Sequence, residues 1–209
     1  MPAAPLRRPL TALLLGLFAT FAAPAPAAEP EGEPAATVEQ LHATLLETMQ
    51  QAEKLGFDGR NAKVEPVLAA TFDFTTIARV VTGRYWRGLD DSQRQAFVER
   101  FARLSAATYA ARFDSYAGET FRTVGSSEER GYRLIRTELV KTDGTAVSLA
   151  YAVAPSAAGW RIVNVIADGV SDLSLKRADY TSILKDSGME ALLGRLDRQI
   201  ADYRAEATQ

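Results

Sequence analysis

The chain has 209 residues, of which 47% are hydrophobic, and its 24 Lys and Arg residues are slightly outnumbered by 26 Asp and Glu residues. This weakly acidic balance argues against a surface that binds nucleic acid, because phosphate contacts require clustered Lys and Arg side chains. Cysteine is absent, so the fold cannot depend on disulfides and must be stabilised by its apolar core.

The first residues have the pattern of a secretory signal peptide. Arg7 and Arg8 precede an apolar run that ends at Ala23, and a stretch of Pro and Ala follows. The apolar run is shorter than the roughly 20 residues that a membrane-spanning helix needs. We therefore predict export to the periplasm, with cleavage near Ala27 or Ala28.

The remainder of the chain divides into a short tether and one domain. With residues 1–28 assigned to the signal peptide, residues 29–36 contain mostly Pro, Glu, Gly and Ala, so we predict a disordered tether. Thr37 and Gln40 have the spacing of a capping box, which marks the start of the domain. Residues 37–206 suffice for one well-buried core and are too few for two, so we predict a single domain.

Hydrophobic periodicity predicts helices first, strands next and helices last. The first helices are expected over 37 to about 56, 64–71, 75–82, and 90 or 91 to about 116, the last with an unusually aromatic face. Strands are expected over 119–125, 131–141, 145–154 and 160–167, and helices again over 173–185 and 189–203. This order predicts an α+β fold, with helices on one face of a curved antiparallel sheet of about four strands and an apolar cavity between the layers.

Two features of the strands add detail. Residues 125–127 and Asp143-Gly144 are turn signals, and the second favours a type I′ hairpin turn with positive φ at both central residues. Strand 145–154 carries large apolar side chains on one face and mainly alanines on the other. Small residues on a sheet face leave room for a ligand, although an ordinary filled core explains the same apolar inventory.

Residues suited to catalysis are scarce. His42 is the sole histidine, and we predict a surface or boundary position for it on the first helix. No nucleophile elbow, phosphate-binding loop or metal-ligand cluster occurs in the sequence. The adjacent carboxylates Asp90-Asp91 and Glu128-Glu129 are explained as a helix cap and a charged turn. We therefore predict no enzyme activity, no metal and no cofactor.

A short basic stretch has two interpretations. Arg79, Arg84 and Arg87 lie near Trp86 in the sequence and are suited to holding a lipid phosphate or docking a partner. The other interpretation is a solvated helix edge, since charged side chains mostly lie in water.

An ordered series of short motifs, none specific alone, resembles the MlaC-like periplasmic phospholipid-shuttle proteins, also called toluene-tolerance auxiliary proteins. The motifs are Phe72-Asp73-Phe74, Ala78-Arg79, Gly83-Arg84, Trp86-Arg87, Arg94, Phe97, Phe101, Thr108-Tyr109-Ala110, Tyr116-Ala117-Gly118-Glu119, Arg136-Thr137, Gly159-Trp160-Arg161-Ile162 and Asp168-Gly169-Val170-Ser171. The resemblance implies a fold related to the NTF2-like cone, with lipid acyl chains between helices and sheet. It also implies docking on an inner-membrane ABC-transporter complex and an outer-membrane lipoprotein complex.

The sequence departs from the usual pattern of that family after Ser171. The segment from Asp172 to Arg177, followed by Tyr180, looks more like the hopanoid-biosynthesis-associated, HpnM-like branch. The cargo is therefore left open between a diacyl phospholipid and a pentacyclic hopanoid. Two other functions also stay open: an envelope assembly factor with a filled core, and an NTF2-like isomerase or hydrolase that uses Asp73 or Asp168.

For a carrier, the lipid-binding residues are expected on the long aromatic helix, on the central strands and at the turn that follows them. The predicted residues are Ile77, Val81, Leu104, Tyr109, Phe113, Tyr132, Leu149, Tyr151, Val165 and Val170. A charged residue in place of Tyr151 or Phe113 should abolish lipid binding in a variant that still folds.

Overall fold

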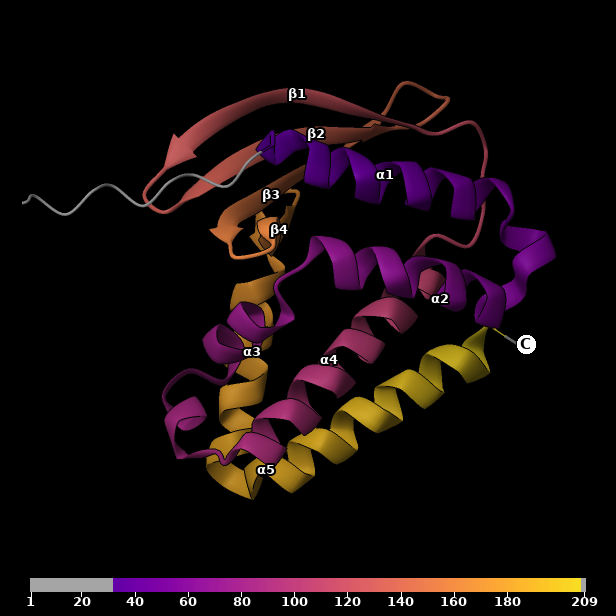
Figure 1. Cartoon of the computed structure of the whole chain (residues 1–209). Helices are drawn as coiled ribbons and strands as arrows, with labels where there is room; N and C mark the ends of the chain where they lie inside the picture. Colours follow the sequence, from indigo (N-terminus) through magenta and orange to yellow (C-terminus); the bar gives the residue numbers. More distant parts are fainter. Residues whose placement is uncertain (1–31, 208–209) are drawn as a thin grey trace, which may run out of the picture.

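The computed structural model of the protein describes residues 32–207. The predicted signal peptide, residues 1–28, and the first three residues of the predicted tether, 29–31, lie outside these residues. Within them, a curved antiparallel sheet forms one layer, and the helices form a second layer on one side of it (Figure 1). The predicted α+β fold, with helices on one face of the sheet, is confirmed.

The segments that link the first helices are shorter than the sequence indicates. Their bounds are α1 Pro34–Gln50, α2 Ala52–Thr71, α3 Phe74–Thr82, the 3-10 helix η1 Gly83–Gly88, and α4 Asp91–Arg112. Helix α1 begins at Pro34, a favoured residue in the first helical turn, and so includes the end of the predicted tether. Helix α2 includes residues 57–63, which we expected to form a loop. Gly56 within it has a non-helical conformation.

Local capping explains where α3 and α4 begin. The Asp73 carboxylate accepts hydrogen bonds from the Thr76 amide at 2.8 Å and the Thr76 hydroxyl at 2.6 Å. Asp90 and Gln93 form a reciprocal capping box at the start of α4. Helix α4 ends at Arg112, earlier than predicted, because Phe113 leaves the helical conformation and the chain turns towards the sheet.

The sheet has five strands in the order β1-β2-β3-β4-β5, where we expected about four. Their bounds are β1 Thr120–Glu129, β2 Tyr132–Val140, β3 Ala146–Ser156, β4 Gly159–Ala167 and β5 Val170–Ser171. The predicted turn at 125–127 is wrong: β1 continues through it with a register shift between Thr123 and Gly125. Such a bulge adds a residue and bends the strand without ending it.

The hairpin between β2 and β3 is not the predicted type I′ turn. Among the described residues other than glycine, only Asp168 has a positive φ, so Asp143 does not meet the type I′ requirement, although Gly144 has φ of 83°. The Gly144 amide donates to the Lys141 carbonyl at 3.0 Å, and the Lys141 amide donates to the Thr145 carbonyl at 2.8 Å. This is the three-residue hairpin with a glycine bulge.

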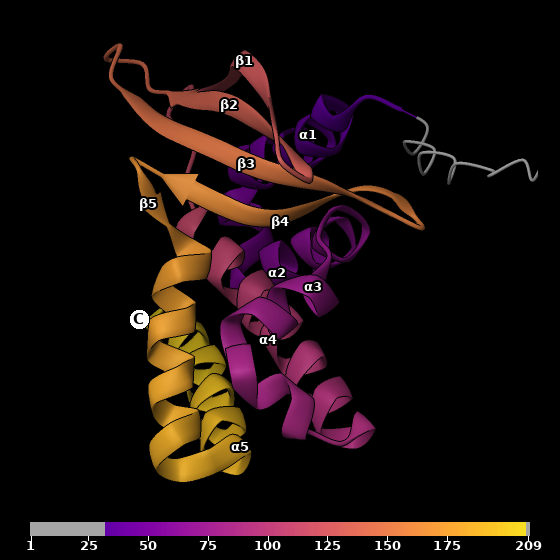
Figure 2. The same cartoon turned by 90° about the vertical axis from the view of Figure 1, so that its left-hand side faces the viewer.

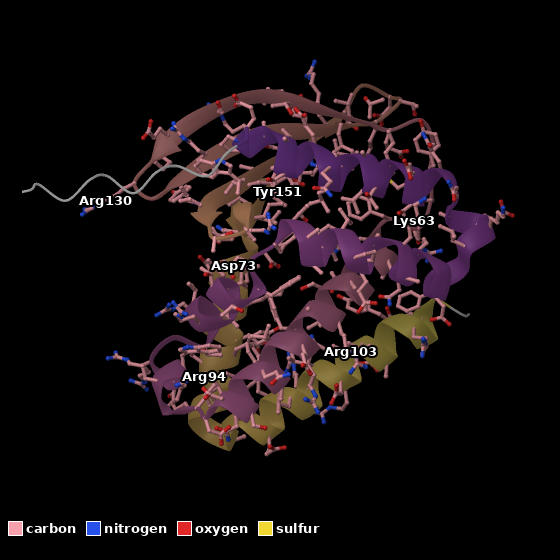
Figure 3. The ribbon with its side chains drawn as sticks, viewed as in Figure 1. Lys63, Asp73, Arg94, Arg103, Arg130 and Tyr151 are labelled. Carbon is pink, nitrogen blue, oxygen red and sulfur yellow. The ribbon has the colours of Figure 1, made fainter. Side chains whose placement is uncertain are left out.

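The side chains on the two faces of the sheet differ in size, and only one face is covered by the helices. Leu149 and Tyr151 of β3 face the helices, and Tyr151 is only 2% exposed. In Figure 3 Tyr151 lies inside the fold, whereas Arg103 and Arg130 lie at the surface. The alanines of β3 alternate with these large residues and therefore point away from the helices. The expected room for a ligand is thus not on the alanine face.

The C-terminal helix α5, Asp172–Glu206, starts directly after β5 and is interrupted at Gly188, which has φ of 78°. Its first half descends from the sheet, and its second half returns alongside α4 (Figures 1 and 2). The two predicted C-terminal helices therefore form one helical run with a sharp bend. No helix among the described residues is long and apolar enough to cross a membrane.

Candidate functional site

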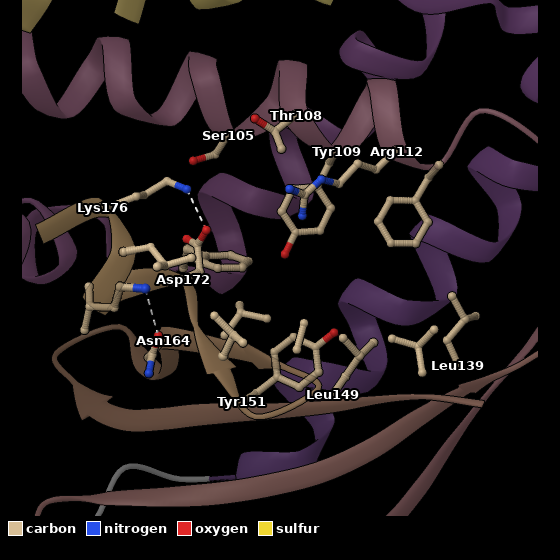
Figure 4. Close-up of a pocket in the computed structure, with 18 of the residues that line it drawn as sticks. Ser105, Thr108, Tyr109, Arg112, Leu139, Leu149, Tyr151, Asn164, Asp172 and Lys176 are labelled. Atoms are coloured by element: carbon tan, nitrogen blue, oxygen red, sulfur yellow. Dashed lines mark hydrogen bonds and ion pairs between the residues drawn. The ribbon is translucent and has the colours of Figure 1, made fainter. Parts of the chain in front are cut away.

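A cavity of about 560 Å³ lies between the sheet and the helices, on the inner side of β2, β3 and β4 (Figure 4). Helix α4 forms the opposite wall, and the start of α5 closes one side. Its volume lies within the range of about 300–1,000 Å³ that is usual for small-molecule sites.

The inner end of the cavity is apolar and is built mostly by aromatic side chains. The link between α2 and α3 pairs with β4, because the Asp73 amide donates to the Ile162 carbonyl at 3.0 Å. This link places Phe72 and Phe74 side by side at the cavity wall, with stacked rings 5.6 Å apart. Phe101 of α4 meets Phe74 edge to face, so the inner end consists of closely packed rings.

The mouth of the cavity combines exposed apolar and basic side chains. Val170 is 52% exposed and Leu175 is 60% exposed, and both line the cavity. Arg112 and Lys141, also exposed, line the cavity as well. Exposed large apolar side chains at the edge of an apolar cavity are typical of a surface that meets a lipid or a protein partner.

The start of α5 is held firmly at this mouth. The Asn164 side-chain oxygen accepts hydrogen bonds from the Ser171 hydroxyl and the Leu173 amide, each at 3.2 Å. Asp172 and Lys176 form an ion pair of 2.6 Å on the cavity side of the helix (Figure 4). These contacts fix the side of the mouth that carries Val170.

On the inner side of the sheet, His42 of α1 contacts the cavity residue Tyr151. His42 is 6% exposed, its Nε2 lies 3.0 Å from the Tyr151 hydroxyl, and its ring stacks on Phe121 at 4.0 Å. The predicted surface or boundary position of His42 is therefore wrong, because α1 crosses the inner face of the sheet. Burial lowers the pKa of His42 to about 4, so its ring is neutral at neutral pH.

The predicted lipid-binding residues are gathered at the cavity with two exceptions. Those at its wall are Ile77, Leu104, Tyr109, Phe113, Leu149, Tyr151, Val165 and Val170. Val81 lies fully buried in the core beside the cavity, and Tyr132 lies at the exposed start of β2. Phe72, Phe74 and Phe101 line the cavity but were not predicted to do so, although the Phe72-Asp73-Phe74 motif drew attention to two of them.

The two carboxylates considered for catalysis have structural contacts. Asp73 caps α3, and the Asp168 carboxylate accepts a hydrogen bond from the Ser148 amide at 3.0 Å. Neither residue lines the cavity. No group of three or more His, Asp or Glu side chains in the described part of the chain is suited to hold a metal ion.

The basic stretch lies away from the cavity. Arg84 lines a separate open groove between η1 and α5, together with Arg177 and Lys185. Arg84 packs over the ring of Tyr85 at 5.0 Å. Neither Arg79 nor Arg87 lines the cavity, so these residues do not contribute to the site.

Comparison with known proteins identifies the family. A sequence model described as MlaC protein matches residues 39–198, which is most of the chain. The chain belongs to the MlaC family. The resemblance inferred from the motifs is thereby confirmed, and members of this family are lipid-binding transport proteins and not enzymes.

Two relatives extend this result. The MlaC binding protein of an intermembrane phospholipid transport system from Haemophilus influenzae is 22% identical over 123 residues, which cover 56% of this chain and 58% of that protein. A phospholipid-binding protein from Ralstonia solanacearum, solved in complex with a phospholipid, matches with a TM-score of 0.72 at 20% identity. This match covers 82% of our chain and 99% of the other, and it shows that the two proteins share the same α+β fold.

Proposed function

We propose that this MlaC-family protein is a periplasmic carrier that moves phospholipid between membranes with the acyl tails inside the cavity. The observation that carries the proposal is the cavity itself, with aromatic rings at its inner end and exposed Val170 and Leu175 at its mouth. The Ralstonia relative, which was solved with a phospholipid, supports phospholipid as the cargo.

The free energy of lipid hydration explains why such a carrier needs a cavity. Exposing a methylene group to water costs about 0.8 kcal/mol, so two acyl chains of roughly 30 methylenes cost on the order of 20 kcal/mol. A carrier that keeps the tails in apolar surroundings makes each transfer nearly balanced in free energy. The protein then needs no catalytic group, in agreement with the composition of the cavity wall.

The partners that we propose are an inner-membrane ABC-transporter complex and an outer-membrane lipoprotein complex. The resemblance of the motifs and the name of the Haemophilus relative support a place in such a relay. Val170 and Leu175 at the mouth are the residues we expect a partner to cover during transfer, because tails leaving the cavity must not meet water.

The alternative of an envelope assembly factor requires a filled core. A cavity of about 560 Å³ argues against a filled core, because packed interiors contain few voids larger than a water molecule. A hopanoid remains a second candidate cargo, and the chemical class of the extracted lipid separates it from phospholipid.

A pair of variants on β3 tests the proposal. Leu149 lines the cavity, whereas Ala146 lies exposed on the same strand. Leu149→Glu places a carboxylate against the expected position of the tails, so the purified variant should contain little or no lipid. Ala146→Glu is the matched control and should contain as much lipid as the unchanged protein. Equal lipid content in both variants, with circular dichroism showing both folded, would overturn the proposal.

A further inference from the structure

The cavity wall on α4 becomes more polar towards the mouth. Phe101 and Leu104 are buried, Tyr109 is half-buried and Arg112 is exposed, and all four line the cavity. A glycerophospholipid has the same order of polarity, from its tails through its ester groups to its phosphate. An acyl lipid that lies along α4 with its tails near Phe101 therefore places its phosphate near Arg112.

The ring of Tyr109 is held in one place by its neighbours. It stacks on Phe113 with the ring centroids 5.7 Å apart and an interplanar angle of 11°. The edge contact with Phe72, at 6.2 Å and 73°, holds it from another side. The hydroxyl of Tyr109 consequently points from α4 across the cavity towards the sheet (Figure 4).

This hydroxyl makes no hydrogen bond to any other described residue. The Tyr151 hydroxyl on the opposite wall differs, because it pairs with His42 Nε2 at 3.0 Å. Burial raises the pKa of Tyr109 above its ordinary value, so the group keeps its proton and is a donor. A fixed donor in a largely apolar cavity favours a ligand that brings an acceptor to that position.

We propose that the Tyr109 hydroxyl donates a hydrogen bond to an ester carbonyl of the bound lipid, with the lipid phosphate beside Arg112. The inference rests on the proposed function and adds the class of linkage that the cavity recognises. Tyr109 and Arg112 are three residues apart on α4, so their side chains are neighbours on the helix surface. In a glycerophospholipid only the glycerol backbone separates the phosphate from the ester carbonyls.

The linkage provides the test. Diacyl lipids carry ester carbonyls, whereas dialkyl lipids of the same chain length and headgroup carry ether oxygens, which are weaker acceptors. The affinities of diacyl and dialkyl phosphatidylglycerol are measured by displacement of a fluorescent lipid from the delipidated protein. Tyr109→Phe should weaken binding of the diacyl lipid about threefold to tenfold, the effect of one neutral hydrogen bond. Its binding of the dialkyl lipid should be unchanged.

Tyr180→Phe is the matched control, because Tyr180 is a buried tyrosine that packs on Phe97 outside the cavity wall. It should leave both affinities unchanged. Unchanged diacyl affinity in Tyr109→Phe, or an equal loss for both lipids, would overturn the inference. A protein that binds neither lipid before substitution would instead contradict the proposed carrier function.

Discussion

His42 and Tyr151 join the first helix to the cavity wall. The His42 Nε2 atom and the Tyr151 hydroxyl are 3.0 Å apart, and 109 residues separate them in the chain. The pair lies between α1 and β3, so a change in the protonation of His42 acts directly on a residue that lines the cavity.

We predict that His42 makes the fold sensitive to acid. Its pKa in the folded protein is about 4, below its ordinary value of 6.5, because burial disfavours the charged ring. As the pH falls from about 6.5 towards 4, the unfolded chain binds a proton that the folded protein does not. The free energy of unfolding should fall by about 3 kcal/mol across this window and level off below it.

Urea unfolding at several pH values measures this effect. His42→Gln removes the titrating group and should make the decline between pH 6.5 and 4 shallower than in the unchanged protein. Parallel pH profiles for the two proteins would contradict the assignment of the acid sensitivity to His42.

Arg60 is predicted to hold α2 against α4. It is 7% exposed, and its guanidinium donates to the Ala110 carbonyl at 2.8 Å and to the Ala52 carbonyl at 3.1 Å. Arg60→Met leaves both carbonyls without this donor and should lower the free energy of unfolding by about 2–3 kcal/mol. Arg103→Met, at an exposed position of α4, should change it by less than about 0.5 kcal/mol. Similar losses in both variants would contradict the role of Arg60.

The bend in α5 is predicted to depend on Gly188. Its φ of 78° and ψ of −175° belong to a region that is open almost solely to glycine, and no atom lies within 4 Å of an added Cβ. Gly188→Ala should therefore destabilise the fold by about 1–3 kcal/mol through backbone strain alone. In Gly194→Ala the added Cβ meets Arg198 at an ordinary 3.5 Å. This control should be neutral or stabilising by up to about 1 kcal/mol, and thermal unfolding compares the two variants.

Features set by neighbouring residues were predictable from the sequence. The cap at Asp73, the capping box at Asp90 and the break at Gly188 each depend on contacts or conformations within a few residues. The middle of helix α2, residues 57–63, was missed because Gly56 and Gly59 disfavour a helix locally. Buried contacts of the helix, including that of Arg60, outweigh this preference.

The candidate site was predictable only as a set of apolar residues. Ile77 and Val81 are one turn apart on the same buried face of α3, yet only Ile77 reaches the cavity. Periodicity identifies a buried face but does not separate a cavity wall from a filled core. The burial of His42 depends on β1 and β3, which are distant in sequence, so no local pattern indicated it.

The measurement that tests the carrier function most directly is native mass spectrometry of the protein purified from its own host, followed by organic extraction. We predict a complex with a bound glycerophospholipid whose mass is recovered in the extract. A hopanoid in its place would contradict the proposed cargo. Protein that carries no lipid, and takes none up when incubated with phospholipid vesicles, would contradict the carrier function itself.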